Sequence, residues 1–293
     1  MRYATFIYEG KEHTGVYLDG YYPFSELLGR DTPVSLLEFI RTYENKSIPD
    51  FLGIVDDRQL KPLQQVTLRA PIPYPFRDII CLGKNYADHA KEVLETKLET
   101  QKEDFIPQSP VYFAKSACPA MGHQEKISLP EHFTNQIDYE AELAVIIGKT
   151  AKDVASDRVK DYIFGYTIIN DLTARDIQAR YGQWFFGKSL DGLCPMGPVI
   201  VSADEIAFPV ELDISCKVNG RLCQYSNTSN LIFDIPRVVS ELSHGMTLYP
   251  GDIIATGTPG GVGHAAKPPR YLQKGDEVEC EIDKIGVLSN NFC

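Results

Sequence analysis

The sequence predicts an α+β fold that is mostly β, with a small N-terminal α+β domain ahead of a larger body. Short runs of apolar and β-branched residues recur along the 293-residue chain and are typical of strands. Helical patterns are fewer, and they do not alternate regularly with the strands as they do in a doubly wound sheet. A proline-rich segment near residue 71 indicates where the N-terminal domain ends.

Residues 1–70 contain two strand-like runs, at 3–8 and 15–18, and one helical pattern. We expect that helix to open at Asp31-Thr32-Pro33, a capping residue followed by a proline, and to continue through SLLEFIRTY. Prolines 71, 73 and 75 then favour extended backbone, because proline also restricts the residue before it. The predicted organisation is an N-terminal domain (1–70), a linker (71–77) and a catalytic domain (78–293).

In the larger body, strand-like runs dominate. Helices are expected at 87–94 and at 235–244, the second closing at Gly245. Residues 95–109 are strongly charged and poor in apolar side chains, which predicts a mobile surface loop or lid. The expected strands are DIICLG, PVYFAK, AELAVIIG, YIFGYTII, LDISCKVNG, GDIIATG and EVECEI.

Composition excludes several classes of partner. A net charge of −11 argues against nucleic acid and against an anionic membrane surface, so an anionic substrate would need a local cation. The N-terminal residues show no signal-peptide pattern, and no run approaches the roughly 20 apolar residues that cross a bilayer. Seven cysteines without CxxC spacing favour a reducing cytoplasm over a disulfide framework or a zinc site.

Acidic residues alternate with apolar ones in the segment 138–148. On a strand, residues two apart share a face, so Asp138, Glu140 and Glu142 are expected to project together. Such oxygen ligands suit Mg²⁺ or Mn²⁺ better than zinc. Asp171, where another apolar run ends, is a candidate third ligand. The alternatives are a water-facing edge strand for the first three and a turn or helix cap for Asp171.

His89 and Glu92 are three residues apart and share one face if this segment is a helix. A carboxylate that binds one imidazole nitrogen raises the basicity of the other, which suits activation of water. The alternative is a solvated helix surface. Lys188 follows aromatic residues and could pair with a substrate carboxylate, or lie on the surface.

The glycine-rich segment 257–263 is not a phosphate-binding loop, because no Lys-Ser/Thr pair follows it and prolines block the next helix. Its backbone amides and the Thr258 hydroxyl could instead bind a small carboxylate.

Several long segments, in a fixed order, resemble the fumarylacetoacetate hydrolase family between about Asp78 and Asn291. The resemblance implies a mixed β-sandwich roll, a homodimer and a divalent metal, Mg²⁺ or Mn²⁺. The matching segments are GKNYADHAKE, DYEAELAVIIGK, FGYTIINDLTARDIQ, GKSLDGLCPMGP and GMTLYPGDIIATGTPGGVG.

The same resemblance implies a role for each candidate residue. The metal ligands would be Glu140, Glu142 and Asp171. The His89–Glu92 dyad would lie on a short helix that orders when substrate binds, and Lys188 would join it in catalysis. The residues that would contact a 2-oxo acid are Arg175, Gln178, Lys188 and Thr258.

The expected activity is metal-dependent cleavage of a carbon–carbon bond in a small 2-oxo or 1,3-dicarbonyl acid, with the metal acting as a Lewis acid that stabilises an enolate. The build is most similar to bacterial members grouped with oxaloacetate decarboxylases and 2-hydroxyhepta-2,4-diene-1,7-dioate isomerases. Decarboxylation of oxaloacetate and hydrolysis of an acylpyruvate are the leading reactions. An isomerase of that heptadiene-dioate type is the first alternative, and a non-catalytic metal- or metabolite-binding scaffold is the second.

Overall fold

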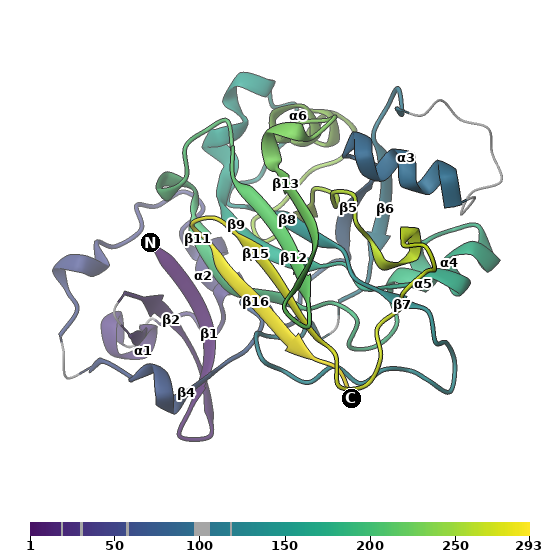
Figure 1. The fold of residues 1–293 in the computed structure, drawn as a ribbon. Coiled ribbons are helices and arrows are strands. Elements are labelled where there is room, and N and C mark those ends of the chain that lie inside the picture. Colours follow the sequence, from purple (N-terminus) through teal and green to yellow (C-terminus); the bar gives the residue numbers. More distant parts are fainter. Residues whose placement is uncertain (19, 30–31, 57–58, 97–105, 118) are drawn as a thin grey trace.

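Figure 1 shows the fold in a computed structural model, which describes residues 1–18, 20–29, 32–56, 59–96, 106–117 and 119–293. Strands hold 33% of the residues and helices 24%, which confirms the predicted α+β, mostly β class. The strands form a ten-stranded sheet, a four-stranded sheet and a two-stranded ribbon. In the described ranges no helix is both long enough and apolar enough to cross a membrane.

The N-terminal region is drawn in purple in Figure 1. Its helix α2 begins later than predicted, because Ser35 and not Asp31 caps it. The Ser35 hydroxyl accepts a hydrogen bond from the Glu38 amide (3.1 Å), which satisfies one of the free donors at a helix start. Asp31 itself lies outside the described residues. The elements are β1 (Arg2–Tyr8), β2 (Lys11–Tyr17), β3 (Tyr21–Pro23), α1 (Phe24–Leu27), α2 (Leu36–Thr42) and β4 (Val66–Leu68).

The strands of this region belong to the same sheet as those of the body. Strand β1 pairs antiparallel with β11 (Met196–Ser202), with Arg2 opposite Val201 and Tyr3 opposite Ile200. The ten-stranded sheet therefore runs without a break in the order β3-β2-β1-β11-β9-β8-β14-β5-β6, and β4 pairs with β1. The domain boundary at 71–77 stays a prediction.

The centre of the large sheet is apolar on both faces. Every residue of β8 and β9 is buried, as expected for near-continuous apolar strands. The predicted strands of this sheet are present, whereas β11 was not predicted. The remaining strands are β5 (Ile79–Gly83), β6 (Val111–Lys115), β8 (Ala141–Ile147), β9 (Ile163–Asn170) and β14 (Ile253–Ala255).

The four-stranded sheet packs on the large one and encloses a core between them, with β12 against β8 and β15 against β9. Alternate residues of β12 and β15 face this core, so their burial has the period of two that a one-sided sheet requires. The strand order is β13 (Arg221–Asn227), β12 (Asp213–Val218), β15 (Glu277–Ile282) and β16 (Gly286–Asn291). The prediction missed β13 and β16.

Four α-helices lie around the sheets of the larger body. Helices α3 and α6 were predicted, and the Asp234 carboxylate caps α6 by accepting from the Arg237 amide (2.9 Å). Helices α4 and α5 were not predicted. Most of the predicted lid at 95–109 lies outside the described residues. The segments are α3 (Ala87–Thr96), α4 (Arg175–Tyr181), α5 (Phe185–Lys188) and α6 (Ile235–Gly245), with 3₁₀ turns η2 (Phe51–Gly53), η4 (Leu63–Gln65), η5 (Ser156–Tyr162), η6 (Ala203–Glu205), η7 (Thr228–Asn230) and η8 (Gly263–Ala265).

Helix α2 stabilises the N-terminal region through its buried face, which allows a matched test. Leu36 is 1% exposed, whereas Leu52 in η2 is 66% exposed. We expect Leu36→Ala to lower the free energy of unfolding by about 2–5 kcal/mol, because it leaves a cavity. Leu52→Ala should change that energy by less than about 0.5 kcal/mol. Urea denaturation followed by circular dichroism measures both, and equal effects would contradict this packing.

Candidate active site

The predicted acidic strand is interrupted in the structure. Asp138 ends a short strand, β7 (Ile137–Asp138), which pairs with β10 (Thr173–Ala174), and β8 begins only at Ala141. At the break, side-chain oxygens take the place of a partner strand as hydrogen-bond acceptors. The Glu140 backbone amide donates to Asn170 Oδ1 (3.0 Å), and the Ala141 backbone amide donates to Gln224 Oε1 (3.1 Å). A single continuous strand was therefore a wrong prediction.

The acids of this segment do not face water. Asp138 is 0%, Glu140 3% and Glu142 1% exposed, so the alternative of a solvated edge strand is wrong. Asp171, which follows β9, is also buried, and its amide donates to the Glu140 carbonyl (2.8 Å). One carboxylate oxygen each of Glu140, Glu142 and Asp171 lies within 4.8 Å of the others. The fold thus brings together the three residues expected as metal ligands.

Two of these acids are paired with buried cations. The Lys188 ammonium lies 2.6 Å from both Glu140 Oε2 and Asp171 Oδ2. Arg175 Nη2 lies 2.6 Å from Glu140 Oε1, and Lys115 Nζ lies 2.9 Å from Asp171 Oδ1. Lys115 was not predicted. The signal in the sequence is a single charged residue that directly follows the apolar run VYFA, a pattern that indicates a buried cation at the end of a strand. Lys188, a candidate for binding substrate, contacts two of the protein's own acids.

The two glutamates respond oppositely to this environment. Burial alone would raise the pKa of Glu140, but Lys188 and Arg175 outweigh it and lower that pKa to about 2. For Glu142, burial raises the pKa well above its usual value, and the neighbouring Asp171 and Glu140 carboxylates raise it further. No described cation forms an ion pair with Glu142, which accepts only the Gly257 amide (2.9 Å).

A divalent cation fits this donor set. A buried carboxylate without a counter-ion is costly, and a cation beside Glu142, Glu140 and Asp171 would neutralise it. All three are hard oxygen donors, which Mg²⁺ and Mn²⁺ prefer. The separation of the oxygens allows one ion to reach all three.

Asp138 is buried but does not belong to the acid cluster. It accepts from Arg175 Nε (2.9 Å) and from the amides of Gly263 (2.7 Å) and His264 (3.0 Å). It therefore orients Arg175 and fastens the glycine-rich segment to the site. Gln178, on the next turn of α4, accepts from Arg175 Nη1 (3.1 Å).

The glycine-rich segment binds the protein's own acids. In addition to the Gly257 bond, the Gly261 amide donates to Glu92 Oε1 (2.7 Å). Gly257 and Gly261 have φ angles of +98° and +104°, which glycine adopts without strain. Both amides already have a partner, so in this segment a substrate carboxylate would bind to the Thr258 hydroxyl. The same hydroxyl accepts a hydrogen bond from Gln224 Nε2 (2.8 Å). Gln224 had no signal in the sequence, because it lies on a strand that was not predicted.

Helix α3 brings the predicted dyad to the site. His89 is 6% exposed, so the alternative of a solvated helix surface is wrong. Its Nδ1 lies 3.4 Å from Glu92 Oε2. Because Gly261 holds the other oxygen of Glu92, the carboxylate has a fixed position from which to orient the imidazole.

A narrow cavity joins these groups. Its walls combine the apolar side chains of Leu82, Val93, Phe113 and Trp184 with polar ones. The polar walls consist of Lys84, which was not predicted, and seven of the nine predicted site residues: His89, Glu140, Glu142, Arg175, Gln178, Lys188 and Thr258. Glu92 and Asp171 are not in the wall but contact residues that are. The cavity therefore brings an imidazole, two buried cations and two carboxylates together in a small space.

Comparisons with known proteins match most of the chain. Residues 78–293 match the family model described as fumarylacetoacetate (FAA) hydrolase C-terminal. The chain is 49% identical over 230 residues to oxaloacetate tautomerase YisK of Bacillus subtilis (strain 168), covering 78% of this chain and 74% of that protein. A solved structure of fumarylacetoacetate hydrolase from psychrophilic Exiguobacterium antarcticum superposes with a TM-score of 0.84 at 39% identity, over 100% of this chain and 99% of the other. A 5-carboxymethyl-2-hydroxymuconate delta-isomerase from Mycobacterium smegmatis has a TM-score of 0.73 at 30% identity, with the same coverage.

The raised pKa of Glu142 generates a stability prediction. Between the usual pKa of 4.5 and the raised folded value, the folded chain holds a proton that the unfolded chain lacks. Stability of the metal-free protein therefore falls as pH rises through this window. Glu142→Gln removes this titration and can keep the bond from Gly257. We expect it to raise the melting temperature of metal-free protein at pH 7 and to flatten its pH dependence.

The same variant tests the metal. Saturating Mn²⁺ at about 100 times Kd should stabilise the wild-type protein by about 2.7 kcal/mol and Glu142→Gln far less. Glu211→Gln, at an exposed position, is the matched control and should behave as wild type. Calorimetric melting with and without Mn²⁺ measures both effects. A destabilised metal-free Glu142→Gln protein would contradict the charge argument.

Proposed function

The chain belongs to the fumarylacetoacetate hydrolase family, and on that premise we propose that it is an enzyme that interconverts the keto and enol forms of oxaloacetate. The observation that carries the proposal is the buried His89–Glu92 pair on a cavity that also holds Arg175 and Lys188. The name of the Bacillus subtilis relative, an oxaloacetate tautomerase, supports this choice of reaction.

The residues of the cavity suit a proton transfer. In the keto form a proton on C3 must leave, and in the enol form a proton resides on the C2 oxygen. His89 takes the C3 proton and returns one to that oxygen, so one C–H bond breaks, one O–H bond forms and the substrate keeps its charge. Glu92 holds the imidazole in place. This pairing of a base with an orienting carboxylate is typical of general acid–base catalysis.

The buried cations of the cavity stabilise the enolate intermediate. Negative charge moves onto the C2 oxygen when the C3 proton leaves, and buried positive groups stabilise such charge more than water does. Nearby Asp171 and Glu140 outweigh burial and raise the pKa of Lys188, so this side chain stays charged and acts as an electrostatic group. When bound at Glu140, Glu142 and Asp171, a divalent cation would supply Lewis-acid stabilisation of the same charge. Apolar walls, such as Phe113 and Trp184, exclude water.

Cleavage of a carbon–carbon bond is the second candidate, because it passes through the same type of enolate. One similar solved structure supports this candidate. It is that of a maleylpyruvate hydrolase from Sphingobium sp. SYK-6, which matches this chain with a TM-score of 0.76 at 31% identity. Decarboxylation would release pyruvate from oxaloacetate, whereas tautomerisation releases nothing. Isomerisation of a longer conjugated acid uses the same proton-transfer residues.

We further propose that the enzyme acts as a homodimer.

Loss of the imidazole should abolish most of the activity. We expect His89→Gln to lower kcat by about 10²- to 10⁴-fold, because it removes the base. The decay of enol oxaloacetate absorbance, corrected for the spontaneous reaction in the same buffer, measures the rate. His132→Gln, an exposed histidine outside the cavity, is the matched control and should retain full activity. Unchanged turnover in His89→Gln would rule out His89 as the base.

Metal removal and product analysis separate the candidate reactions. After exhaustive treatment with EDTA we expect activity to be lost, and Mg²⁺ or Mn²⁺ should restore it. A coupled assay with lactate dehydrogenase reports pyruvate in parallel with the enol absorbance. Enol loss without extra pyruvate supports the tautomerase, whereas matched pyruvate release supports the decarboxylase. Full activity of the metal-free protein would contradict the role given to the acid cluster.

A further inference from the structure

A third cation, Lys84, lines the narrow cavity of the candidate active site (the catalytic cavity) together with Arg175 and Lys188. The residue is only 8% exposed. It lies in the turn between β5, which ends at Gly83, and α3, which carries His89. Lysine is almost never buried to this extent unless its charge is paired, so a ligand with a negative group suits this part of the wall.

The backbone of Lys84 has a conformation that lysine rarely adopts. Its φ angle is +56°, in the left-handed region where a Cβ crowds the following carbonyl. The next residue, Asn85, fixes the turn. Its side-chain amide donates to the carbonyls of Thr256 (2.8 Å) and Phe233 (3.0 Å), and its Oδ1 accepts from the Phe233 amide (2.8 Å). Strained residues of this kind collect at ligand sites, where the surrounding structure maintains them, so the strain indicates a function for the Lys84 side chain.

Lys84 and Thr258 follow two neighbouring strands. Because β5 and β14 pair in parallel, their carboxyl ends lie side by side. Lys84 follows β5, Thr258 follows β14, and both line the catalytic cavity. A Cβ at Gly83 would lie 2.2 Å from Cζ3 of Trp184, so the indole packs directly on the backbone next to Lys84. This part of the wall thus combines an ammonium and a hydroxyl with an apolar ring.

The other two cations of the wall bind acids of the protein itself. Arg175 and Lys188 both pair with Glu140. Lys188 also pairs with Asp171. A substrate with two carboxylates brings two more negative charges into a small cavity, and buried charges must be matched by opposite ones. Lys84 adds a positive charge to the wall outside these ion pairs.

We propose that Lys84 binds the substrate carboxylate that is farther from the keto group, and so makes the enzyme selective for a diacid. In oxaloacetate the C2 oxygen faces the cations beside the acid cluster, and the C3 proton faces His89. The C4 carboxylate is attached to the other side of C3, so it lies away from those cations, at the wall formed by Lys84 and Trp184. This inference rests on the proposed function, which supplies the identity of the substrate.

Two substrates that differ only in this group test the proposal. 2-Oxobutanoate has a methyl group in place of the C4 carboxylate of oxaloacetate. Exchange of the C3 protons in heavy water, followed by proton NMR and corrected for exchange without enzyme, reports enolisation of both acids. We expect Lys84→Met to lower the ratio of kcat/KM for oxaloacetate to kcat/KM for 2-oxobutanoate by about 10- to 100-fold, the range for loss of a charged hydrogen bond. Lys84→Arg keeps the charge and should restore most of the ratio. An unchanged ratio in Lys84→Met, even with lower activity on both acids, would overturn the proposal.

A binding measurement separates this proposal from the proposed reaction. L-Malate and (S)-2-hydroxybutanoate carry a hydroxyl in place of the keto oxygen, so neither can enolise. In isothermal titration with Mg²⁺ present, we expect the wild-type chain to bind malate about 10- to 100-fold more tightly than 2-hydroxybutanoate, and Lys84→Met to lose this preference. If the wild-type chain showed the preference without turning over oxaloacetate, the proposed function would fail and the role of Lys84 would stand. Equal binding of the two acids by the wild-type chain, or a preference that persists in Lys84→Met, would overturn that role.

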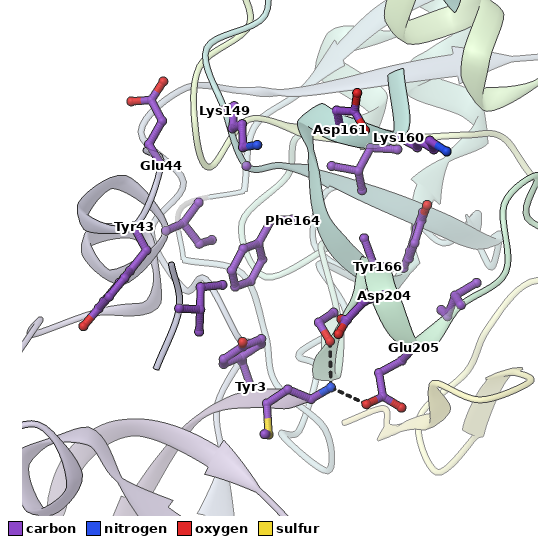
Figure 2. A pocket seen from close by; sticks show the side chains of 18 of the residues that line it. Tyr3, Tyr43, Glu44, Lys149, Lys160, Asp161, Phe164, Tyr166, Asp204 and Glu205 are labelled. Carbon is purple, nitrogen blue, oxygen red and sulfur yellow. Dashed lines mark hydrogen bonds and ion pairs between the residues drawn. The ribbon is translucent and has the colours of Figure 1, made fainter. Parts of the chain in front are cut away.

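Lys160→Met is the matched control, because it makes the same change at a lysine outside the site. Lys160 is exposed and lines a larger cavity, which Figure 2 shows. That cavity shares no wall residue with the catalytic cavity. Lys160→Met should therefore keep both the substrate ratio and the preference for malate. Loss of either in this variant would mean that the selectivity does not come from Lys84, and would overturn the proposal.

Discussion

The burial of four carboxylates inside a largely apolar β-sandwich is the constraint on which the rest of this structure depends. Asp138, Glu140, Glu142 and Asp171 are each at most 3% exposed. An isolated buried charge of this kind would be neutralised by a shift in pKa, so the surrounding chain must supply positive groups. It does so from three separate elements: Lys115 on β6, Arg175 on α4 and Lys188 on α5. Of the four, only Glu142 forms no ion pair with a described cation, and a divalent ion beside it would balance this charge.

Local patterns were sufficient for much of the fold. Apolar runs located β5, β6, β8 and β9, and the helical pattern that closes at Gly245 located α6. Tertiary contacts decided the rest. The strand β13 has exposed apolar side chains such as Leu222, so its sequence lacks the alternation of a one-sided strand. The start of α2 depended on which of two capping residues was used.

The family resemblance named a set of residues that the structure brings together, but it did not give their contacts. The order of long motifs pointed to Glu140, Glu142 and Asp171, and the structure places their oxygens together. No sequence spacing could show that Lys115 reaches Asp171 across 56 residues, because that ion pair depends on how β6 and the end of β9 are arranged. The break after Asp138 was equally invisible, since it requires Asn170 and Gln224 from other strands.

The bonds from glycine amides to the acids have a consequence for how such a site can diverge. A Cβ at Gly261 would lie 2.0 Å from the Cys223 carbonyl oxygen, and one at Gly263 would lie 2.8 Å from Asp138 Oδ1. Neither glycine can therefore change without moving a carboxylate or the backbone beside it. Acid and glycine therefore constrain each other, so that a substitution at one requires a compensating change at the other.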